Sequence, residues 1–132
     1  MNFHSKNDII RSSNDMNRPY FKHFIIELVT DSNNLNSIKW LKEKTELLLL
    51  SLKIKYVKDI FHQFSPSGIS LVYILSSSHI AIHTWPENKY LHIDLITCSQ
   101  NKELENIASI VKATFNNENV NIKELNYYEK QR

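Results

Sequence analysis

The chain has 132 residues, of which 42% are hydrophobic and 23% charged, proportions typical of a globular domain. The net charge is only +2 and the lysines are scattered along the sequence, so we expect neither a basic patch nor a nucleic-acid partner. No apolar run approaches the roughly 20 residues that a membrane-spanning helix needs, so no membrane association is expected either. A chain of this length is expected to form a single domain.

The first nineteen residues are polar and rich in Asn and Ser, and we expect them to form a flexible tail ahead of one domain over residues 20–132. They contain no apolar segment of the kind that marks a secretory signal. Cys98 is the only cysteine, so an internal disulfide cannot form, which fits a reducing compartment. We therefore expect a cytoplasmic protein.

The sequence of the N-terminal part of the domain predicts a strand followed by a helix. Residues 21–29 are apolar and β-branched enough for a first strand. Over residues 35–52, apolar side chains recur at spacings of three, four and seven, which predicts a helix with one buried face. The residues of this face are Leu35, Ile38, Leu41, Leu48 and Leu52.

Strands are expected to follow the helix in close succession. Residues 53–64 predict a second strand, which ends at a turn signal over residues 65–68, and residues 69–75 predict a third. Residues 79–84 and 90–97 each alternate between apolar side chains and a second set on the opposite face. The second set is His79, Ala81, His83, Tyr90, His92 and Asp94.

The clearest helical pattern covers residues 102–116, with Asn101 as its expected cap, and a last strand is expected over residues 120–125. The apolar stripe of this helix is Leu104, Ile107, Ala108, Val111 and Phe115. Runs of strands with two intervening helices predict an α+β fold. The expected architecture is a two-layer sandwich, an antiparallel β-sheet with two helices on one face.

The residues most suggestive of chemistry are a serine run at residues 76–78, then His79 and His83, and later Cys98. By itself, a serine run is typical of a polar turn, and a lone cysteine is typical of a small buried side chain. The same residue types could also build an electron-accepting ketone. An internal serine forms a pyruvoyl group when its hydroxyl takes over the preceding acyl group, and elimination and hydrolysis follow.

Decarboxylation of an amino acid needs such an electron acceptor, which either pyridoxal phosphate or a pyruvoyl group can supply. Pyridoxal phosphate requires a phosphate-binding loop. The chain has one glycine, Gly68, and no glycine-rich loop of that kind. A self-made pyruvoyl group is therefore the better fit to this sequence.

The order and spacing of five sequence elements resemble those of the prokaryotic S-adenosylmethionine decarboxylase proenzymes. These elements are residues 64–70, Ser78-His79, residues 83–87, Asp94 and Thr97-Cys98. The resemblance implies a pyruvoyl-dependent carboxy-lyase that converts S-adenosylmethionine to the aminopropyl donor of spermidine synthesis. It also implies a homodimer whose sites are completed across or near the interface.

The resemblance implies roles in self-cleavage and catalysis for five residues. Cleavage would fall between Ser77 and Ser78, and Ser78 would become the pyruvoyl group that forms a Schiff base with the substrate. His83 would act as the acid or base of processing, assisted by Ser70. Cys98 would protonate the product carbon.

Further residues match positions that bind the substrate. Phe64 would stack on the adenine, and Glu87 would hold the ribose hydroxyls. Glu27 is a looser match to an acidic residue that lines the site. Trp85 is either a core aromatic or an aromatic face for the adenine or the cationic sulfonium.

Several positions depart from the family pattern. Ser77 stands where the family usually has glutamate, and Leu71 and Ser99 stand where it usually has glycine. Leu91 and His92 replace small residues. These departures leave open an ornithine or arginine decarboxylase of the same family, or an unprocessed, non-catalytic homologue that acts as a dimer partner.

The histidines also raise the question of a metal site. His79 and His83 share a face, but at about 3.3 Å per residue they lie too far apart along a strand to bind one tetrahedral ion comfortably. No metal cofactor is expected.

Overall fold

A computed structural model describes residues 17–127. The helices and strands of this region are β1 (Lys22–Val29), α1 (Ile38–Ser51), β2 (Tyr56–Gln63), β3 (Ile69–Leu75), β4 (Ser78–Trp85), β5 (Tyr90–Thr97), α2 (Ile107–Phe115) and β6 (Val120–Leu125). Three short 3-10 turns accompany them, η3 (Asn33–Asn36), η4 (Pro86–Asn88) and η5 (Lys102–Asn106). The expected N-terminal tail lies almost entirely outside the described residues.

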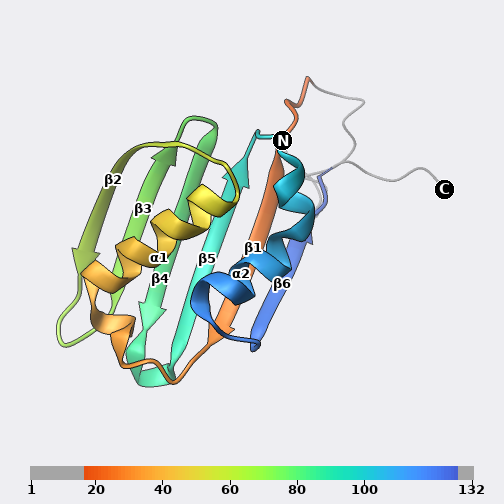
Figure 1. Ribbon diagram of the computed structural model, residues 1–132. Helices are drawn as coiled ribbons and strands as arrows, with labels where there is room; N and C mark the ends of the chain where they lie inside the picture. Colours follow the sequence, from red (N-terminus) through yellow and green to blue (C-terminus); the bar gives the residue numbers. More distant parts are fainter. Residues whose placement is uncertain (1–16, 128–132) are drawn as a thin grey trace, which may run out of the picture.

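All six strands form one antiparallel sheet in the order β2-β3-β4-β5-β1-β6. Both helices lie on the same face of this sheet (Figure 1). The expected α+β two-layer sandwich is therefore confirmed. Strand β1, from the start of the domain, lies between β5 and β6 from its end, so distant parts of the sequence are neighbours in the sheet.

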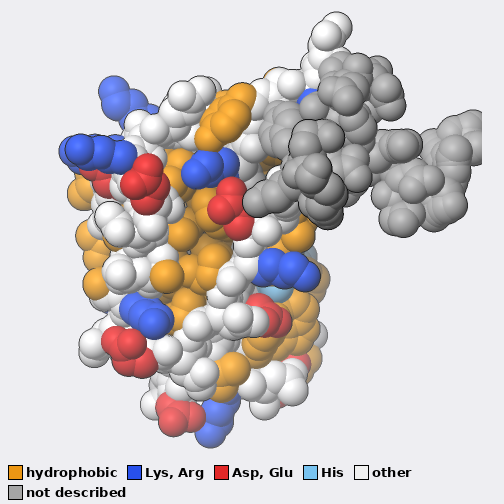
Figure 2. All heavy atoms as spheres, turned by 90° about the vertical axis from the view of Figure 1, so that its right-hand side faces the viewer, with side chains coloured by type: hydrophobic (Ala, Val, Ile, Leu, Met, Phe, Trp, Pro, Cys, Tyr) orange, Lys and Arg blue, Asp and Glu red, His pale blue; other side chains and the backbone are white. Residues whose placement is uncertain are grey.

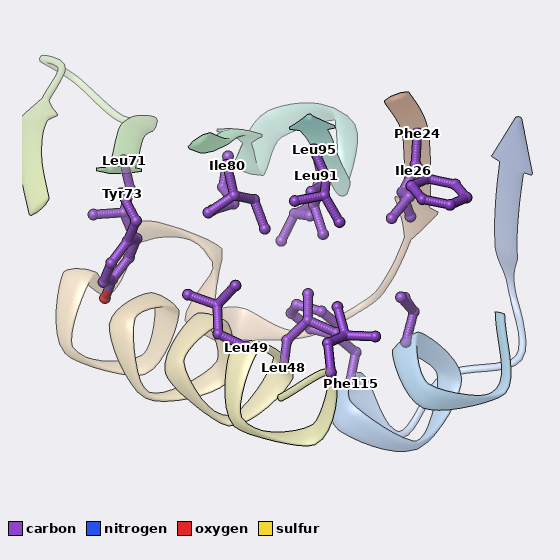
Figure 3. Packing of buried hydrophobic residues seen from close by; sticks show 14 of the residues in the cluster. Phe24, Ile26, Leu48, Leu49, Leu71, Tyr73, Ile80, Leu91, Leu95 and Phe115 are labelled. Atoms are coloured by element: carbon purple, nitrogen blue, oxygen red, sulfur yellow. The ribbon is translucent and has the colours of Figure 1, made fainter. Parts of the chain in front are cut away.

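The core lies between the sheet and the two helices. Leu48 and Leu49 of α1 and Phe115 of α2 point toward apolar side chains of the sheet (Figure 3). Along β4, Ile80 and Ile82 are fully buried, whereas His79, Ala81 and His83 are only half-buried, as their alternation predicts.

The sheet face away from the helices, which we call the open face, carries polar side chains in rows that cross the strands. One row contains Ser70, His83, His92 and Glu27, which are cross-strand neighbours on β3, β4, β5 and β1. Within residues 17–127 neither helix covers this face, so the described structure leaves its side chains available to a ligand or to a partner protein.

The first helix is shorter than the sequence pattern predicts. Helix α1 begins at Ile38 because Ser37 caps it, its hydroxyl accepting the Trp40 N–H at 3.1 Å. Leu35 belongs to the separate turn η3, yet its side chain is buried as expected. Leu41 and Leu48 are also buried, as predicted.

The second expected strand begins three residues late. Lys53 adopts a φ of +59°, the left-handed conformation that commonly ends a helix, so the chain turns before β2 begins at Tyr56. The strands expected over residues 69–75, 90–97 and 120–125 coincide with β3, β5 and β6.

The second helical pattern divides into two elements. Residues 102–106 form the 3-10 turn η5, and α2 covers only Ile107–Phe115. Ala108 is exposed and lies outside the buried stripe. Asn101 precedes η5 but makes no capping bond, because its side-chain amide donates to the carbonyls of Leu52 and Lys53 instead.

On the side of β6, basic and acidic side chains are interspersed, and neither charge gathers into one patch (Figure 2). Within residues 17–127, no helix is long and apolar enough to cross a membrane.

We expect Gly68→Ala to destabilise the fold. Gly68 has a φ of +107°, and an added Cβ would lie 3.1 Å from the Thr84 carbonyl oxygen. The strained backbone should lower the free energy of unfolding by about 1–3 kcal/mol. Urea denaturation at one protein concentration measures this, with Ser67→Ala in the same loop as a control that changes stability by less than about 0.5 kcal/mol. Equal stability of Gly68→Ala and the unsubstituted chain would contradict the prediction.

Candidate active site

The expected site residues fall into two clusters at opposite ends of β4. Ser78 begins the strand beside Cys98, and His83 lies near its far end beside Ser70. Five residues at about 3.3 Å each separate Ser78 from His83 by roughly 16 Å along the strand. One chain therefore does not bring Ser78 and His83 together.

The first cluster surrounds the peptide bond between Ser77 and Ser78. Ser78 has a φ of +121°, a conformation that side-chain-bearing residues rarely adopt and that stores strain in the backbone. The Cys98 N–H donates to the Ser77 carbonyl oxygen at 2.9 Å. The Ser78 Oγ and the Cys98 Sγ lie 3.5 Å apart.

This arrangement suits an acyl shift at residue 77. A hydroxyl that attacks the Ser77 carbonyl puts negative charge on its oxygen, and the Cys98 N–H already points at that oxygen. The exposed Cys98 thiol lies next to the residue that would carry the new group. The residues present thus fit the formation of a pyruvoyl group at position 78.

Thr97, which belongs to one of the matched sequence elements but received no role from the sequence, connects this cluster. Its Oγ1 lies 3.1 Å from the Ser77 Oγ and accepts the Ser99 N–H at 3.0 Å. The strand pattern offered a signal, because it placed a hydroxyl at a core position of β5, where a polar group needs partners.

The second cluster centres on His83. Its Nδ1 lies 2.7 Å from the Ser70 Oγ. Burial lowers the pKa of His83, the nearby His92 lowers it further, and Asp94 opposes both effects. The ring is therefore neutral at pH 7 and can accept a proton.

A hollow of about 290 Å³ adjoins His83. Its lining residues are Phe64, Ser67, Gly68, Ile69, Ser70, His83, Thr84, Trp85 and Glu87. Phe64 and Trp85 are 48% and 42% exposed, so each side chain presents aromatic surface that a ligand could contact. The Ser67 hydroxyl donates to the Glu87 carboxylate at 3.3 Å, which holds that carboxylate at the rim.

A larger hollow of about 390 Å³ lies between α1 and the start of β2. Leu49, Leu50 and Ile54 contribute to its lining, which is mainly apolar. It contains none of the residues of the two clusters. The hollow beside His83 is therefore the better candidate for substrate binding.

Glu27 lies beside the second cluster on the open face. Its carboxylate accepts the Tyr90 hydroxyl at 2.7 Å and the Asn121 amide at 3.0 Å, and both bonds lower the pKa of Glu27. Burial and Glu27 raise the pKa of Tyr90 to about 12, so the phenol stays protonated and keeps donating. Tyr90 also lies against Trp85, with ring centroids 5.6 Å apart.

Every histidine within residues 17–127 lies on the open face. They are His23, His62, His79, His83 and His92. His23 Nε2 lies 2.6 Å from Asp94 Oδ1, and its Nδ1 lies 2.8 Å from the Tyr127 hydroxyl. The described region contains no group of three or more His, Cys, Asp or Glu side chains that could hold a metal ion.

Comparison with known proteins finds similarity to S-adenosylmethionine decarboxylases. Residues 22–127 match the family model described as S-adenosylmethionine decarboxylase. The S-adenosylmethionine decarboxylase proenzyme of Clostridium botulinum strain Langeland is 36% identical over 104 residues, which cover 78% of this chain and 90% of the relative. The proenzyme of Pseudomonas aeruginosa strain LESB58 is 37% identical over 78 residues, 58% of this chain and 49% of the relative.

A solved structure shares the fold. The crystal structure of the adenosylmethionine decarboxylase from Aquifex aeolicus VF5 matches with a TM-score of 0.71 at 21% identity, covering 87% of this chain and 96% of that one.

We expect Tyr90→Phe to raise the pKa of Glu27 toward its usual value, because the phenol hydroxyl is the largest cause of its lowering. NMR titration of the Glu27 carboxyl carbon measures the change. Asn121→Ala should raise the pKa of Glu27 by less, because the Asn121 amide lowers this pKa less than the Tyr90 hydroxyl does. An unchanged Glu27 titration in Tyr90→Phe would show that the phenol does not donate to this carboxylate in solution.

Proposed function

The chain belongs to the S-adenosylmethionine decarboxylase family, and we propose that it cuts itself at Ser77-Ser78 and then decarboxylates S-adenosylmethionine. The observation that carries this proposal is the contact set at the scissile peptide. The carbonyl of Ser77 is held by the Cys98 N–H, and the Ser78 hydroxyl lies beside the Cys98 thiol. The product would serve as the aminopropyl donor for spermidine synthesis.

Self-cleavage proceeds by an acyl shift and an elimination. The Ser78 Oγ attacks the Ser77 carbonyl carbon, the C–N bond breaks, and Ser77 becomes esterified to the Ser78 side chain while the Ser78 amine is freed. Removal of the Ser78 α-proton expels the Ser77 carboxylate and leaves dehydroalanine. Water then replaces the nitrogen, which gives a pyruvoyl end on residues 78–132 and ammonia.

The roles in decarboxylation follow from the positions of the side chains. The pyruvoyl carbonyl supplies the electrophile that binds the substrate amine and accepts the electrons left by CO2. Cys98, next to residue 78, donates a proton to the product carbon. A thiol in this role must stay reduced, which supports a cytoplasmic location.

The hollow beside His83 binds the nucleoside part of the substrate. Phe64 offers an exposed ring for the adenine, and Trp85 offers a second aromatic face for the adenine or the sulfonium cation. Glu87 accepts hydrogen bonds from the ribose hydroxyls, and Glu27 lines the site from the neighbouring strand. Ornithine and arginine have no adenine or ribose, so this set of residues favours the nucleoside substrate over them.

A homodimer completes the site, because the two clusters lie at opposite ends of β4 within one chain. A two-fold axis that lies between two stacked open faces and runs across the strands would bring His83 and Ser70 of one copy toward Ser78 of the other. This face carries an apolar set that such pairing would cover. Its members are Ile25, Ile60, Val72, Ile74, Ala81 and Ile96.

Purified protein is expected to contain two fragments, residues 1–77 and residues 78–132, with the second blocked at its N-terminus. Ser78→Ala should remain in one piece because it lacks the attacking hydroxyl. Ser76→Ala, which keeps that hydroxyl, is the matched control and should cleave normally. Denaturing electrophoresis and intact mass measure all three. An uncut chain after long incubation would refute the decarboxylase and favour the non-catalytic homologue.

Mixed dimers test whether the site is shared between two copies. His83→Ala and Ser78→Ala should each stay uncut alone. When the two are unfolded together and refolded, the His83→Ala chain should be cleaved, because its Ser78 then meets the intact His83 of the Ser78→Ala chain. Mass spectrometry identifies the cut chain. Cleavage of His83→Ala by itself, or none in the mixture, would exclude the shared site.

A further inference from the structure

Thr97 is a fully buried hydroxyl residue at the end of β5, immediately before Cys98. Its Oγ1 has two partners, the Ser77 Oγ at 3.1 Å and the Ser99 N–H at 3.0 Å. One partner precedes the proposed cleavage point, and the other follows the proposed proton donor.

Residue 77 is therefore held at two points by two consecutive residues. The Cys98 N–H holds its carbonyl oxygen, and the Thr97 hydroxyl holds its side chain. The bond from Ser99 N–H to Thr97 Oγ1 closes a tight turn around Cys98, and this turn sets the direction in which the Cys98 N–H points.

We propose that Thr97 is a positioning residue for self-cleavage, acting by fixing the Ser77 carbonyl and the Cys98 N–H relative to each other. The inference rests on the self-cleavage proposed above. As the Ser78 hydroxyl attacks, the Ser77 carbonyl carbon becomes tetrahedral and its oxygen gains negative charge. A donor that is already aligned stabilises this charge without first having to move.

The short Ser77 side chain contributes to the same positioning of the Ser77 carbonyl. A hydroxyl at residue 77 both donates and accepts, so it can pair with the Thr97 hydroxyl whichever way that group is turned. The chain thus holds the residue before the cleaved bond through a neutral pair of hydroxyls.

Thr97→Val removes the hydroxyl and keeps the shape of the side chain. We expect self-cleavage to slow by about ten-fold or more, as the loss of one buried hydrogen-bonding partner would produce. Thr97→Ser restores the hydroxyl and should cleave within about two-fold of the unsubstituted chain, by the same reasoning. Pulse-labelled cell-free synthesis followed by electrophoresis measures each rate. Cleavage of Thr97→Val at the unsubstituted rate, or of Thr97→Ser as slowly as Thr97→Val, would overturn the proposal.

Hydroxylamine identifies the step that is slowed. It cleaves the ester between Ser77 and Ser78, giving a hydroxamate on Ser77 and an unmodified serine at the new N-terminus. If Thr97 positions the acyl shift, Thr97→Val forms ester slowly and hydroxylamine will not restore its cleavage rate. Full restoration would mean that the later elimination is the slowed step, and the proposal would fail.

Ser77→Ala provides a variant at a half-buried turn rather than in the core, so it avoids the risk of misfolding. It loses one of the two bonds of Thr97 and should cleave several-fold more slowly, but less slowly than Thr97→Val. An unchanged rate would contradict the proposal. If the unsubstituted chain itself stays whole, the proposed function has failed; if it cleaves and Thr97→Val matches it, only the role of Thr97 has.

Discussion

The one-sided cover of an antiparallel sheet is the constraint on which the rest of this molecule depends. Alternate side chains of β1, β3, β4 and β5 face the two helices, so the apolar half of these four strands is committed to the core. The remaining half faces away from the helices, where Ser70, His83, His92 and Glu27 become cross-strand neighbours. A site on this face can vary its polar residues without disturbing the packing that supports them.

A local departure from this regular pattern marks the point of proposed chemistry. The positive φ of Ser78 interrupts the regular strand at its first residue, and its hydroxyl then lies beside the Cys98 thiol. The regular part of the same strand carries His83 to the far end of the sheet. Ser78 therefore lies at the strained turn before β4. His83, at the other end of the same strand, borders the hollow lined by Phe64 and Trp85.

Much of the fold could be predicted from the sequence, because side-chain alternation and helical spacing are local properties. The strands over residues 69–75, 90–97 and 120–125 coincide with the structure, whereas the helix boundaries do not. The start of α1 depends on the Ser37 cap, and the start of β2 follows the left-handed Lys53; periodicity reports neither. The pairing of Ser70 with His83 depends on strand register, and the roles of Thr97 and Tyr90 depend on tertiary contacts that no spacing rule reveals.

If the chain is cut at the proposed bond between Ser77 and Ser78, the strand order determines how the two fragments stay together. The first fragment would contain β1, β2 and β3, yet β1 lies between β5 and β6 of the second fragment, and β3 pairs with β4. Three ladders would therefore keep the fragments in one sheet. The covalent link that gave these strands a high effective concentration for one another would be gone. Unfolding would then release two separate polypeptides, and recovery of the native sheet would become a second-order process that slows with dilution.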